Sequence, residues 1–450
     1  MSLATSQEIS NFPTLSEHGK AMLDFMVEHP SAPAFRNHSG NRLLAQEVEE
    51  LREFENAHLA APVAWAPGIL PDWLDQFITH VFAHVPHYRS LGSVPKKLVD
   101  VPAISRADLA ADIAAFVPDT VELARLINFR TTGTTGHPML IASHPVVAAR
   151  YLTFHKRALL LNGITLRHGR GQVGVVLVGF QQRCFTYTSV TPTMDDSGLA
   201  KINLHVDDWR DPADRACYLD ALAPEVMTGD PLSFAELAKL ELTKLPRALI
   251  SVSMAMSPGM RHMLEARFRC PVLDIYSLNE VGPVAVYDAA VGGHLLLQPE
   301  LYVEILDKNG QPVAAGQRGE ICLSGGFNFC MPLLRYRTGD FAAMANSIKG
   351  PMLLGLAGRS PVRFQTRTGD WVNNIDITHA LQALPLPQYG FHQKADGRSI
   401  IRLAPSVMYL ADQAKQALAA LFDIQQLSVE MITTEDKILQ YTSDLEGAYP

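Results

Sequence analysis

The 450-residue sequence contains only five cysteines, and no two of them form a CxxC pair. An odd number of scattered cysteines argues against a disulfide framework, so reduced thiols in the core are expected. A structural zinc site that uses Cys322, Cys330 and a distant histidine stays open, although the spacing does not match a zinc knuckle. The scarcity of cysteine therefore argues against a small disulfide-rich secreted domain.

The sequence also lacks a long apolar run and an excess of positive charge. The apolar run at 173–180 covers only eight residues, whereas a membrane-spanning helix needs about 20. The first residues lead into a polar stretch, so no secretory signal is predicted. A formal net charge of -8 argues against binding to nucleic acid or an anionic membrane. We therefore expect a cytoplasmic protein without nucleic-acid or membrane partners.

The sequence shows no internal repeat and no low-complexity tract, and its length predicts more than one hydrophobic core. The continuous β-branched run at 172–179 is typical of a strand buried on both faces, which predicts a parallel sheet flanked by helices. Periodicity and turn residues predict helices at 45–54, 73–85, 146–161 and 256–267, further strands at 248–253 and 272–276, and a hairpin over 304–323. The fold class is therefore α/β with a β-rich subdomain.

The most informative stretch reads RTTGTTGHPM over residues 130–139. Glycine permits positive φ, so backbone N–H groups can converge on an anion, and threonine hydroxyls add further donors. This composition suits a loop around phosphate oxygens. It is not the GxxxxGK[ST] loop, because no Lys-Ser/Thr pair follows the second glycine. Taken alone, the stretch is more typical of an exposed polar hairpin turn.

Two further stretches carry candidate ligand-binding side chains. Strand 272–276 ends at Tyr276, and Glu280 follows four residues later before a Gly-Pro turn. Ligands of open α/β sheets bind at the carboxyl ends of strands, where a tyrosine can stack on a base and a carboxylate can hold Mg²⁺. Asp340, in RTGD, has the chemistry to accept two ribose hydroxyls. The alternative for Tyr276 is a tyrosine of the hydrophobic core, and the alternative for the RTGD stretch is an ordinary turn.

Together these stretches resemble the adenylate-forming superfamily of acyl-CoA synthetases and adenylation domains, and within it the phenylacetate–CoA ligase branch. The matching stretches are HVPHYRSLG (84–92), VPAISRADL (101–109), RTTGTTGHP (130–138), DIYSLNEVGP (274–283), YVEILDKNGQPVAAGQRGEI (302–321), MPLLRYRTGDF (331–341), GRSP (358–361) and TGDWVNNID (368–376). The resemblance implies a large N-terminal domain of parallel-rich sheets flanked by helices (66–357), a small mobile C-terminal α/β domain (358–450), and a helical extension (1–65) that the family does not cover.

The resemblance also implies roles for individual residues. Tyr276, with Ser277 beside it, would bind adenine, Glu280 would coordinate Mg²⁺, and Asp340 would bind the ribose with help from Arg359. Lys437 would bridge the substrate carboxylate and the α-phosphate, the alternative being an ordinary solvated lysine. The β- and γ-phosphates of ATP would be held by Thr131, Thr132, Gly133, Thr134, Thr135 and Gly136. The acyl pocket would be lined by Phe180, Phe185, Tyr187, Met254 and Ala255, which suit an aryl or heteroaryl acid.

The implied function is an AMP-forming acid–thiol ligase that uses ATP, Mg²⁺ and coenzyme A. Three departures from the family pattern qualify it. Met139 stands where many members have lysine, Pro361 stands near the hinge where it should restrict the domain swing, and residues 253–256 lack the usual glutamate. The alternatives are transfer of the acyl group to an amine or carrier protein, as in phenazine-type antibiotic assembly, and a non-catalytic nucleotide or acyl-adenylate binder. The expected partner is a small carboxylic acid, and a homodimer is the candidate assembly.

Overall fold

The computed structural model of the chain describes residues 10–130, 139–358, 362–434 and 438–448. The chain divides into two compact units. Unit 1 comprises Met1–Ser16, Gly40–Leu166 and Leu273–Arg359, and unit 2 comprises Glu17–Ser39, Arg167–Val272 and Ser360–Pro450. The predicted extension thus contributes residues to both units, and the predicted domain boundaries after residues 65 and 357 stay predictions. Within the described ranges no helix is long and apolar enough to cross a membrane.

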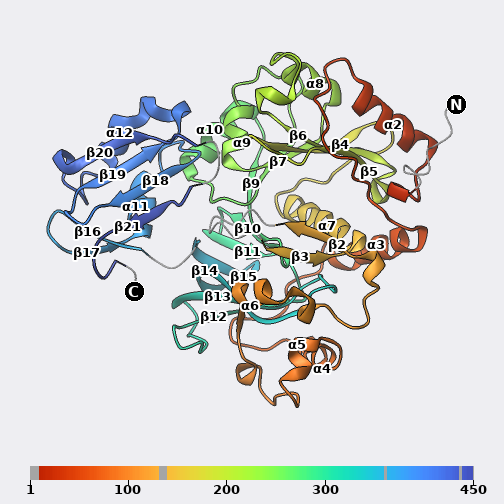
Figure 1. Cartoon of the computed structure of the whole chain (residues 1–450), viewed down its shortest axis with the longest axis horizontal. Helices are drawn as coiled ribbons and strands as arrows, with labels where there is room; N and C mark the ends of the chain where they lie inside the picture. Colours follow the sequence, from red (N-terminus) through yellow and green to blue (C-terminus); the bar gives the residue numbers. More distant parts are fainter. Residues whose placement is uncertain (1–9, 131–138, 359–361, 435–437, 449–450) are drawn as a thin grey trace. The chain divides into compact units, whose positions relative to one another are not determined.

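Figure 1 shows the helices of the described residues. They are α2 (Glu17–Glu28), α3 (Ala45–His58), α4 (Trp73–His84), α5 (Pro86–Ser90), α6 (Arg106–Ala111), α7 (Pro145–Leu161), α8 (Asp214–Leu222), α9 (Pro231–Leu237), α10 (Pro258–Phe268), α11 (Asn374–Leu381) and α12 (Ala411–Leu418). Four of them confirm the helices predicted at 45–54, 73–85, 146–161 and 256–267. Helix α6 begins after Ser105, whose backbone N–H and hydroxyl both donate to Asp108 Oδ2, at 2.7 and 2.8 Å. This contact secures the start of the helix.

Unit 2 contains a parallel sheet, as the β-branched run predicts. Its strands are β4 (Val173–Gly179), β5 (Tyr187–Thr191), β6 (Ser197–Asn203), β7 (Val226–Gly229) and β8 (Ala248–Ser251). The order is β8-β7-β4-β6-β5, parallel from β8 to β6, with β5 antiparallel at the end. Helix α2 packs against β5 and β6, where Gly198 gives it room because a Cβ there would lie 2.8 Å from Met22 Sδ.

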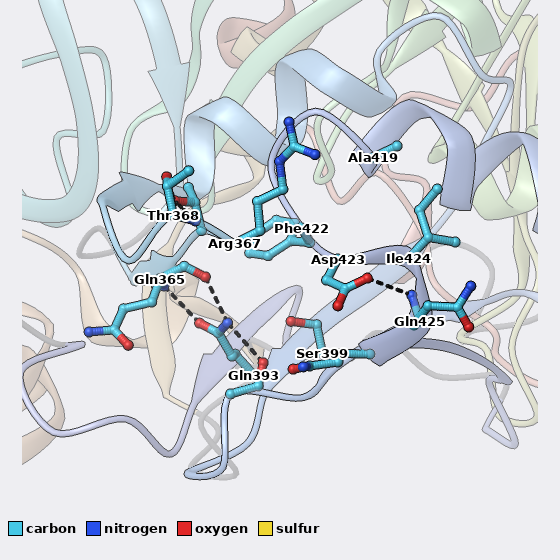
Figure 2. Close-up of a pocket in the computed structure, with 13 residues that line it drawn as sticks. Gln365, Arg367, Thr368, Gln393, Ser399, Ala419, Phe422, Asp423, Ile424 and Gln425 are labelled. Atoms are coloured by element: carbon cyan, nitrogen blue, oxygen red, sulfur yellow. Dashed lines mark hydrogen bonds between the residues drawn. The ribbon is translucent and has the colours of Figure 1, made fainter.

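The C-terminal part of unit 2 is a small α/β module with a hydrophobic core of its own. Its strands are β16 (Arg363–Gln365), β17 (Trp371–Asn373), β18 (Tyr389–Gln393), β19 (Ser399–Leu403), β20 (Leu427–Met431) and β21 (Tyr441–Ser443). Four of them form a sheet in the order β20-β19-β18-β21. A polar hollow of about 650 Å³ lies in this module, and Arg367, Gln393 and Asp423 are among its lining residues (Figure 2). No predicted site residue lines it.

Unit 1 contains the β-rich part of the chain. Its strands are β1 (Ile104–Ser105), β2 (Ile127–Arg130), β3 (Leu140–Ser143), β9 (Val272–Leu278, all but its first residue), β10 (Gly282–Asp288), β11 (Gly293–Leu296), β12 (Leu301–Leu306), β13 (Arg318–Gly325), β14 (Leu333–Ser347) and β15 (Gly350–Ala357). An antiparallel sheet runs β12-β13-β14-β15-β11-β10-β9. The predicted hairpin over 304–323 is confirmed as β12 and β13.

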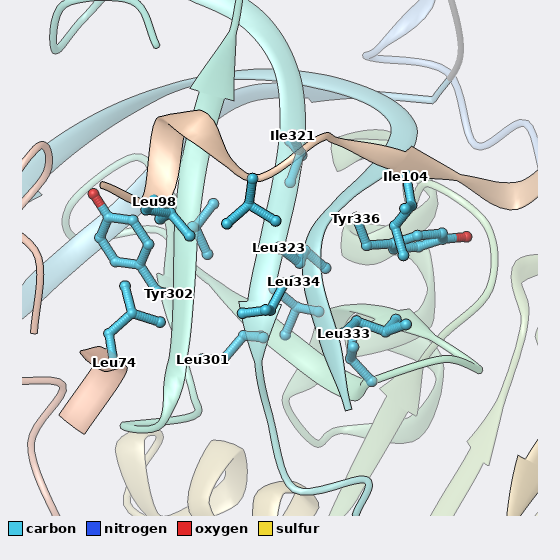
Figure 3. Packing of buried hydrophobic residues seen from close by; sticks show 14 of the residues in the cluster. Leu74, Leu98, Ile104, Leu301, Tyr302, Ile321, Leu323, Leu333, Leu334 and Tyr336 are labelled. Carbon is cyan, nitrogen blue, oxygen red and sulfur yellow. The ribbon is translucent and has the colours of Figure 1, made fainter. Parts of the chain in front are cut away.

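The core of unit 1 fixes strand β14, which carries two of the residues that matter below. Leu333 and Leu334 are fully buried and Tyr336 is 2% exposed. Figure 3 shows these side chains packed among those of β12 and β13, with Tyr336 close to Ile104 of β1. Strand β14 pairs with β13 on one side, and Tyr336 is opposite Leu323 there. We therefore expect this part of β14 to be rigid.

Candidate active site

A tight turn between β9 and β10 presents Tyr276 and Glu280. The two strands are antiparallel, with Leu278 opposite Gly282. Gly282 has a φ of 78°, and a Cβ there would lie 2.4 Å from the Phe327 ring. The turn therefore requires glycine. It leaves the Tyr276 side chain half-buried and buries Glu280, which is only 5% exposed.

Asp340 lies on β14 directly after a glycine, and Glu320 of β13 holds this part of β14 in place. Glu320 Oε1 accepts the backbone N–H of Gly339 at 3.1 Å, and its Oε2 accepts Arg337 Nε–H at 2.8 Å. The Thr338 hydroxyl oxygen accepts the Asp340 N–H at 3.1 Å. Gly339 has a φ of 79°, which glycine adopts without strain. The backbone at Asp340 is thus fixed by its own unit.

The structure brings Tyr276 and Asp340 together, although they are 64 positions apart in the sequence. The Tyr276 hydroxyl donates a hydrogen bond of 2.8 Å to Asp340 Oδ2. Burial raises the pKa of Tyr276 well above its usual value, and the nearby Asp340 carboxylate raises it further. The phenol therefore stays protonated and acts as a donor. Ser277, the next residue, is opposite Pro283 of β10.

A second tyrosine–carboxylate pair lies between the same two segments. The Tyr336 hydroxyl donates to Glu280 Oε1 at 2.8 Å. The pKa of Tyr336 is raised, first by burial and then by the Glu280 carboxylate. The Glu280 backbone is held as well, because its carbonyl accepts the Asn328 side-chain amide at 3.2 Å. That amide also donates to the Ala142 carbonyl of β3 at 3.3 Å.

The predicted Mg²⁺ role of Glu280 fits the chemistry of this donor. Magnesium prefers oxygen ligands and is usually held by one or two carboxylates together with substrate phosphates and water. In the described part of the chain, no cluster of three His, Cys, Asp or Glu residues forms a complete protein metal site. A single anchored carboxylate such as Glu280 is of the type that commonly binds a nucleotide-bound Mg²⁺.

Several predicted residues lie outside the described residues. These are Thr131, Thr132, Gly133, Thr134, Thr135, Gly136, Arg359, Pro361 and Lys437. The strands that flank the threonine–glycine stretch are described: β2 and β3 are antiparallel, with Arg130 opposite Leu140. Both the phosphate loop and the hairpin turn are compatible with this pairing, so both interpretations stay open.

Met139 occupies a position where many members of the family that the sequence resembles have lysine. Its side chain is 3% exposed and belongs to the core of unit 1, together with Ile141. A charged side chain at this position would carry a large desolvation cost. Methionine therefore suits the position as a core residue, and no charge for the nucleotide comes from it.

The predicted acyl-pocket residues lie in unit 2, on two separate segments. Phe185 is 51% exposed, and its ring meets that of Tyr187 edge-on at 5.6 Å. The Phe180 ring lies 5.9 Å from the ring of His205. Met254 is half-buried and Ala255 is exposed. The exposure of Phe185 argues against a place for it in the core. The assignment of these residues to an acyl pocket stays a prediction.

The sequence interpretation missed two features of the site. Tyr336 and Glu320 were not identified as site residues, although Tyr336 precedes Asp340 by four positions, just as Tyr276 precedes Glu280. The prediction of a strand over 248–253 was too long: the strand ends at Ser251, and Ser253 has a φ of 71°. A non-glycine residue in this region is uncommon and marks a sharp turn directly before Met254.

We expect the ring and the hydroxyl of Tyr276 to contribute differently to nucleotide binding. Tyr276→Phe keeps the ring and removes only the hydroxyl that contacts Asp340, so KM for ATP should change less than about threefold. Tyr276→Ala removes the ring face, and base–aromatic stacking contributes about 1–3 kcal/mol. KM for ATP should then rise about tenfold or more. Steady-state kinetics of the two variants checks this. Equal effects would contradict a stacking role.

Comparisons with known proteins found similar sequences and a similar fold. A family model described as "AMP-binding enzyme" matches residues 180–330. Phenylacetate–coenzyme A ligase of Escherichia coli (strain K12) is 33% identical over 90 residues, which is 19% of this chain and 21% of that protein. The Aromatoleum evansii enzyme of the same name is 34% identical over 90 residues, with 19% and 20% covered. The chain thus matches about a fifth of the length of these curated relatives.

The fold is shared with a solved acyl-CoA ligase structure. That structure is 2-hydroxyisobutyryl-CoA ligase in the postadenylation state in complex with 2-HIB-AMP, with a TM-score of 0.59, 18% identity, and 82% of this chain and 88% of that chain covered. The chain therefore shares its α/β fold with that ligase structure. Together with the family match and the curated relatives, these findings support the adenylate-forming superfamily for this chain. The 90 residues that match the curated relatives are similar to phenylacetate–coenzyme A ligases.

Proposed function

We propose that the protein is an ATP-dependent carboxylate ligase. It adenylates an aryl or heteroaryl carboxylic acid, releases pyrophosphate, and transfers the acyl group to coenzyme A. One observation carries the proposal: Tyr276, Glu280 and Asp340, which the sequence singled out separately, lie in one unit. There the Tyr276 hydroxyl contacts Asp340, and the hydroxyl of Tyr336, on the same strand as Asp340, contacts Glu280, both at 2.8 Å.

Each residue in this arrangement has a task that its position supports. Asp340, on a backbone fixed by Glu320, accepts the two ribose hydroxyls, which replace the Tyr276 hydroxyl as donors. The Tyr276 ring offers a face for adenine. Glu280 holds a magnesium ion, which when bound neutralises phosphate charge during the displacement.

The reaction itself is an in-line displacement at phosphorus. A carboxylate oxygen of the acid forms a bond to the α-phosphorus of ATP, and the bond from that phosphorus to the bridging oxygen of pyrophosphate breaks. The protein contributes positioning and charge neutralisation rather than covalent chemistry. We assign the phosphates to the loop at 131–136 and the reacting carboxylate to Lys437. The thiol of coenzyme A then attacks the acyl carbon and AMP leaves.

An amine or a carrier protein is the alternative to coenzyme A as the acceptor of the acyl group. Pro361 stands near the hinge that this reaction type uses, and proline fixes φ near -65°. A restricted swing of the C-terminal module would favour an amine or carrier protein as acceptor, as in antibiotic assembly.

We further propose that the protein works in the cytoplasm on a small-molecule acid, with a homodimer as its assembly.

Product analysis separates these acceptors. Pyrophosphate release is measured with Mg-ATP and a panel of aryl and heteroaryl acids, with and without coenzyme A, and the products are identified by mass spectrometry. Acid-dependent release that rises with coenzyme A and yields a thioester supports the ligase. Acid-dependent release that ignores coenzyme A points to the amine or carrier protein.

A non-catalytic nucleotide or acyl-adenylate binder is the second candidate, and the burial of Met139 in the core favours it. This position supplies no charge for the phosphates. A pure binder has less need of a buried, anchored Glu280 beside a fixed Asp340, which favours the enzyme. Measurable ATP binding without pyrophosphate release across the whole acid panel would support the binder.

A further inference from the structure

Strand β14 and the segment 276–280 are joined by a reciprocal pair of contacts. Each segment contributes one tyrosine and, four residues later, one carboxylate. Tyr276 donates to Asp340 and Tyr336 donates to Glu280, both at 2.8 Å. The two contacts differ in burial: Tyr276 is half-buried, whereas Tyr336 is 2% and Glu280 is 5% exposed. A ligand that reaches Asp340 can displace the first contact, but the second lies within the core.

The Tyr336 hydroxyl is held at a fixed point. Its backbone lies between β13 and the short strand β1, opposite Leu323 and Ile104. Its ring belongs to the hydrophobic core of unit 1, where Figure 3 shows it close to Ile104. A side chain packed in this way has little rotamer freedom. The donor therefore presents a defined direction to Glu280 Oε1.

The backbone around Glu280 is anchored independently of Tyr336. Asn328 donates to the Glu280 carbonyl, and the Tyr151 hydroxyl donates to the Asn279 carbonyl at 2.9 Å. The main chain is thus set by other residues, and the remaining freedom of Glu280 lies in its side chain. Tyr336 is the described residue that restrains the carboxylate itself.

We propose that Tyr336 is a positioning residue that orients the Glu280 carboxylate toward the magnesium ion of the bound nucleotide. The inference rests on the proposed function, in which Glu280 holds that ion. The Tyr336 hydroxyl engages Oε1 of Glu280, so Oε2 would be the oxygen available to the metal. Outer-shell donors of this type fix the orientation of a ligating carboxylate, and their loss commonly costs about 10–100-fold in metal affinity or activity.

A matched control is available in the same core. Tyr88 is fully buried and belongs to the same cluster. Its hydroxyl donates to the Leu334 carbonyl at 3.2 Å and accepts the Leu334 N–H at 2.8 Å. Tyr88→Phe therefore removes a buried hydroxyl that contacts β14 only two residues from Tyr336, without touching Glu280. This variant shows how much the loss of a buried hydroxyl next to β14 changes metal affinity through the structure alone.

The test measures metal binding directly. Mn²⁺ replaces Mg²⁺ as a paramagnetic probe, and its affinity for the protein in the presence of a non-hydrolysable ATP analogue is determined by electron paramagnetic resonance. Tyr336→Phe should weaken Mn²⁺ binding about tenfold or more, and Glu280→Gln, which approaches the contact from the other side, should weaken it at least as much. Tyr88→Phe should stay within about twofold of the wild type. The Kd of the analogue without metal should stay nearly unchanged in all three variants.

The outcomes separate this inference from the proposed function. Unchanged Mn²⁺ affinity in Tyr336→Phe, or an equal loss in Tyr88→Phe, would overturn the positioning role. A wild-type protein that binds no Mn²⁺ with the analogue would overturn it as well. If the wild type releases no pyrophosphate with any acid but Tyr336→Phe still weakens Mn²⁺ binding, the catalytic function fails and the positioning role stands.

Discussion

Glu280→Gln is expected to lower kcat for acid-dependent pyrophosphate release about 100-fold or more. The amide retains the shape of the side chain and can still accept the Tyr336 hydroxyl, so the fold should persist. It lacks the negative charge that a magnesium ion requires. Removing one electrostatic contribution to a transition state commonly costs about 10²–10³ in kcat. Initial rates of pyrophosphate release at saturating Mg-ATP measure the effect.

Glu304→Gln is the matched control for this variant. Glu304 is buried to a similar degree, at 7% exposed, and lies on β12 of the same unit, paired with Arg335 rather than with a candidate site residue. Glu304→Gln, like Glu280→Gln, replaces a buried carboxylate with an amide and removes one negative charge. Because the change leaves Arg335 without its ion-pair partner, the variant should be less stable. Measured per folded protein, however, its pyrophosphate release should stay within about threefold of the wild type. A comparable loss in both variants would show that Glu280 acts through the fold and not at the nucleotide.

Among the variants described here, Arg335→Leu is expected to lower the free energy of unfolding the most. Arg335 is 3% exposed, adopts a φ of 49°, and its Nε lies 3.4 Å from Glu304 Oε2. It also donates to the carbonyls of Val99, Val101 and Gly310 at 2.8–3.0 Å. Removing one partner of a buried ion pair costs about 3–5 kcal/mol, because the other charge is left unpaired. Urea denaturation followed by tryptophan fluorescence measures the free energy of unfolding.

The stability loss of Arg335→Leu should depend on pH. Burial raises the pKa of Glu304, and Arg335 opposes that rise. Without Arg335 the pKa in the folded state rises further. A carboxyl group whose folded pKa lies above its unfolded value stabilises the fold below the unfolded pKa, and this contribution is lost as the pH rises through the folded pKa. The variant should therefore be closer to the wild type at pH 5 than at pH 8.

A double-mutant cycle tests the cause of that loss. Adding Glu304→Gln to Arg335→Leu removes the unpaired charge, so the double variant should recover part of the free energy of unfolding at pH 8. The three lost carbonyl partners are not restored, so recovery should be incomplete. An equal loss in the single and the double variant, or a loss that does not change with pH, would contradict the ion-pair explanation.

Local patterns predicted much of the fold. The β-branched run became β4 in a parallel sheet, and Ser105 begins α6 through its contact with Asp108. These features depend on residues that are neighbours in the sequence, so periodicity and capping reveal them. The strand predicted at 272–276 is also present, but the structure extends it to Leu278, so Tyr276 lies within β9 and Glu280 in the turn that follows.

The parts that could not be predicted depend on long-range pairing. Tyr336 meets Glu280 across 56 positions, and Tyr276 meets Asp340 across 64. The register of β9, β10, β13 and β14 decides these contacts, and a single sequence does not specify it. The left-handed conformation of Arg335 likewise follows from burial and from carbonyl partners on distant segments, which its own neighbours do not indicate.

We propose that this chain adenylates a carboxylic acid at the site formed by Tyr276, Glu280 and Asp340. Acid-dependent exchange of radiolabelled pyrophosphate into ATP tests it most directly, because the exchange reports the reversible first step whatever the acceptor is. We expect exchange with at least one aryl or heteroaryl acid, and loss of that exchange in both Glu280→Gln and Asp340→Ala. Exchange that survives in both variants, or ATP binding without exchange for any acid of the panel, would contradict the claim.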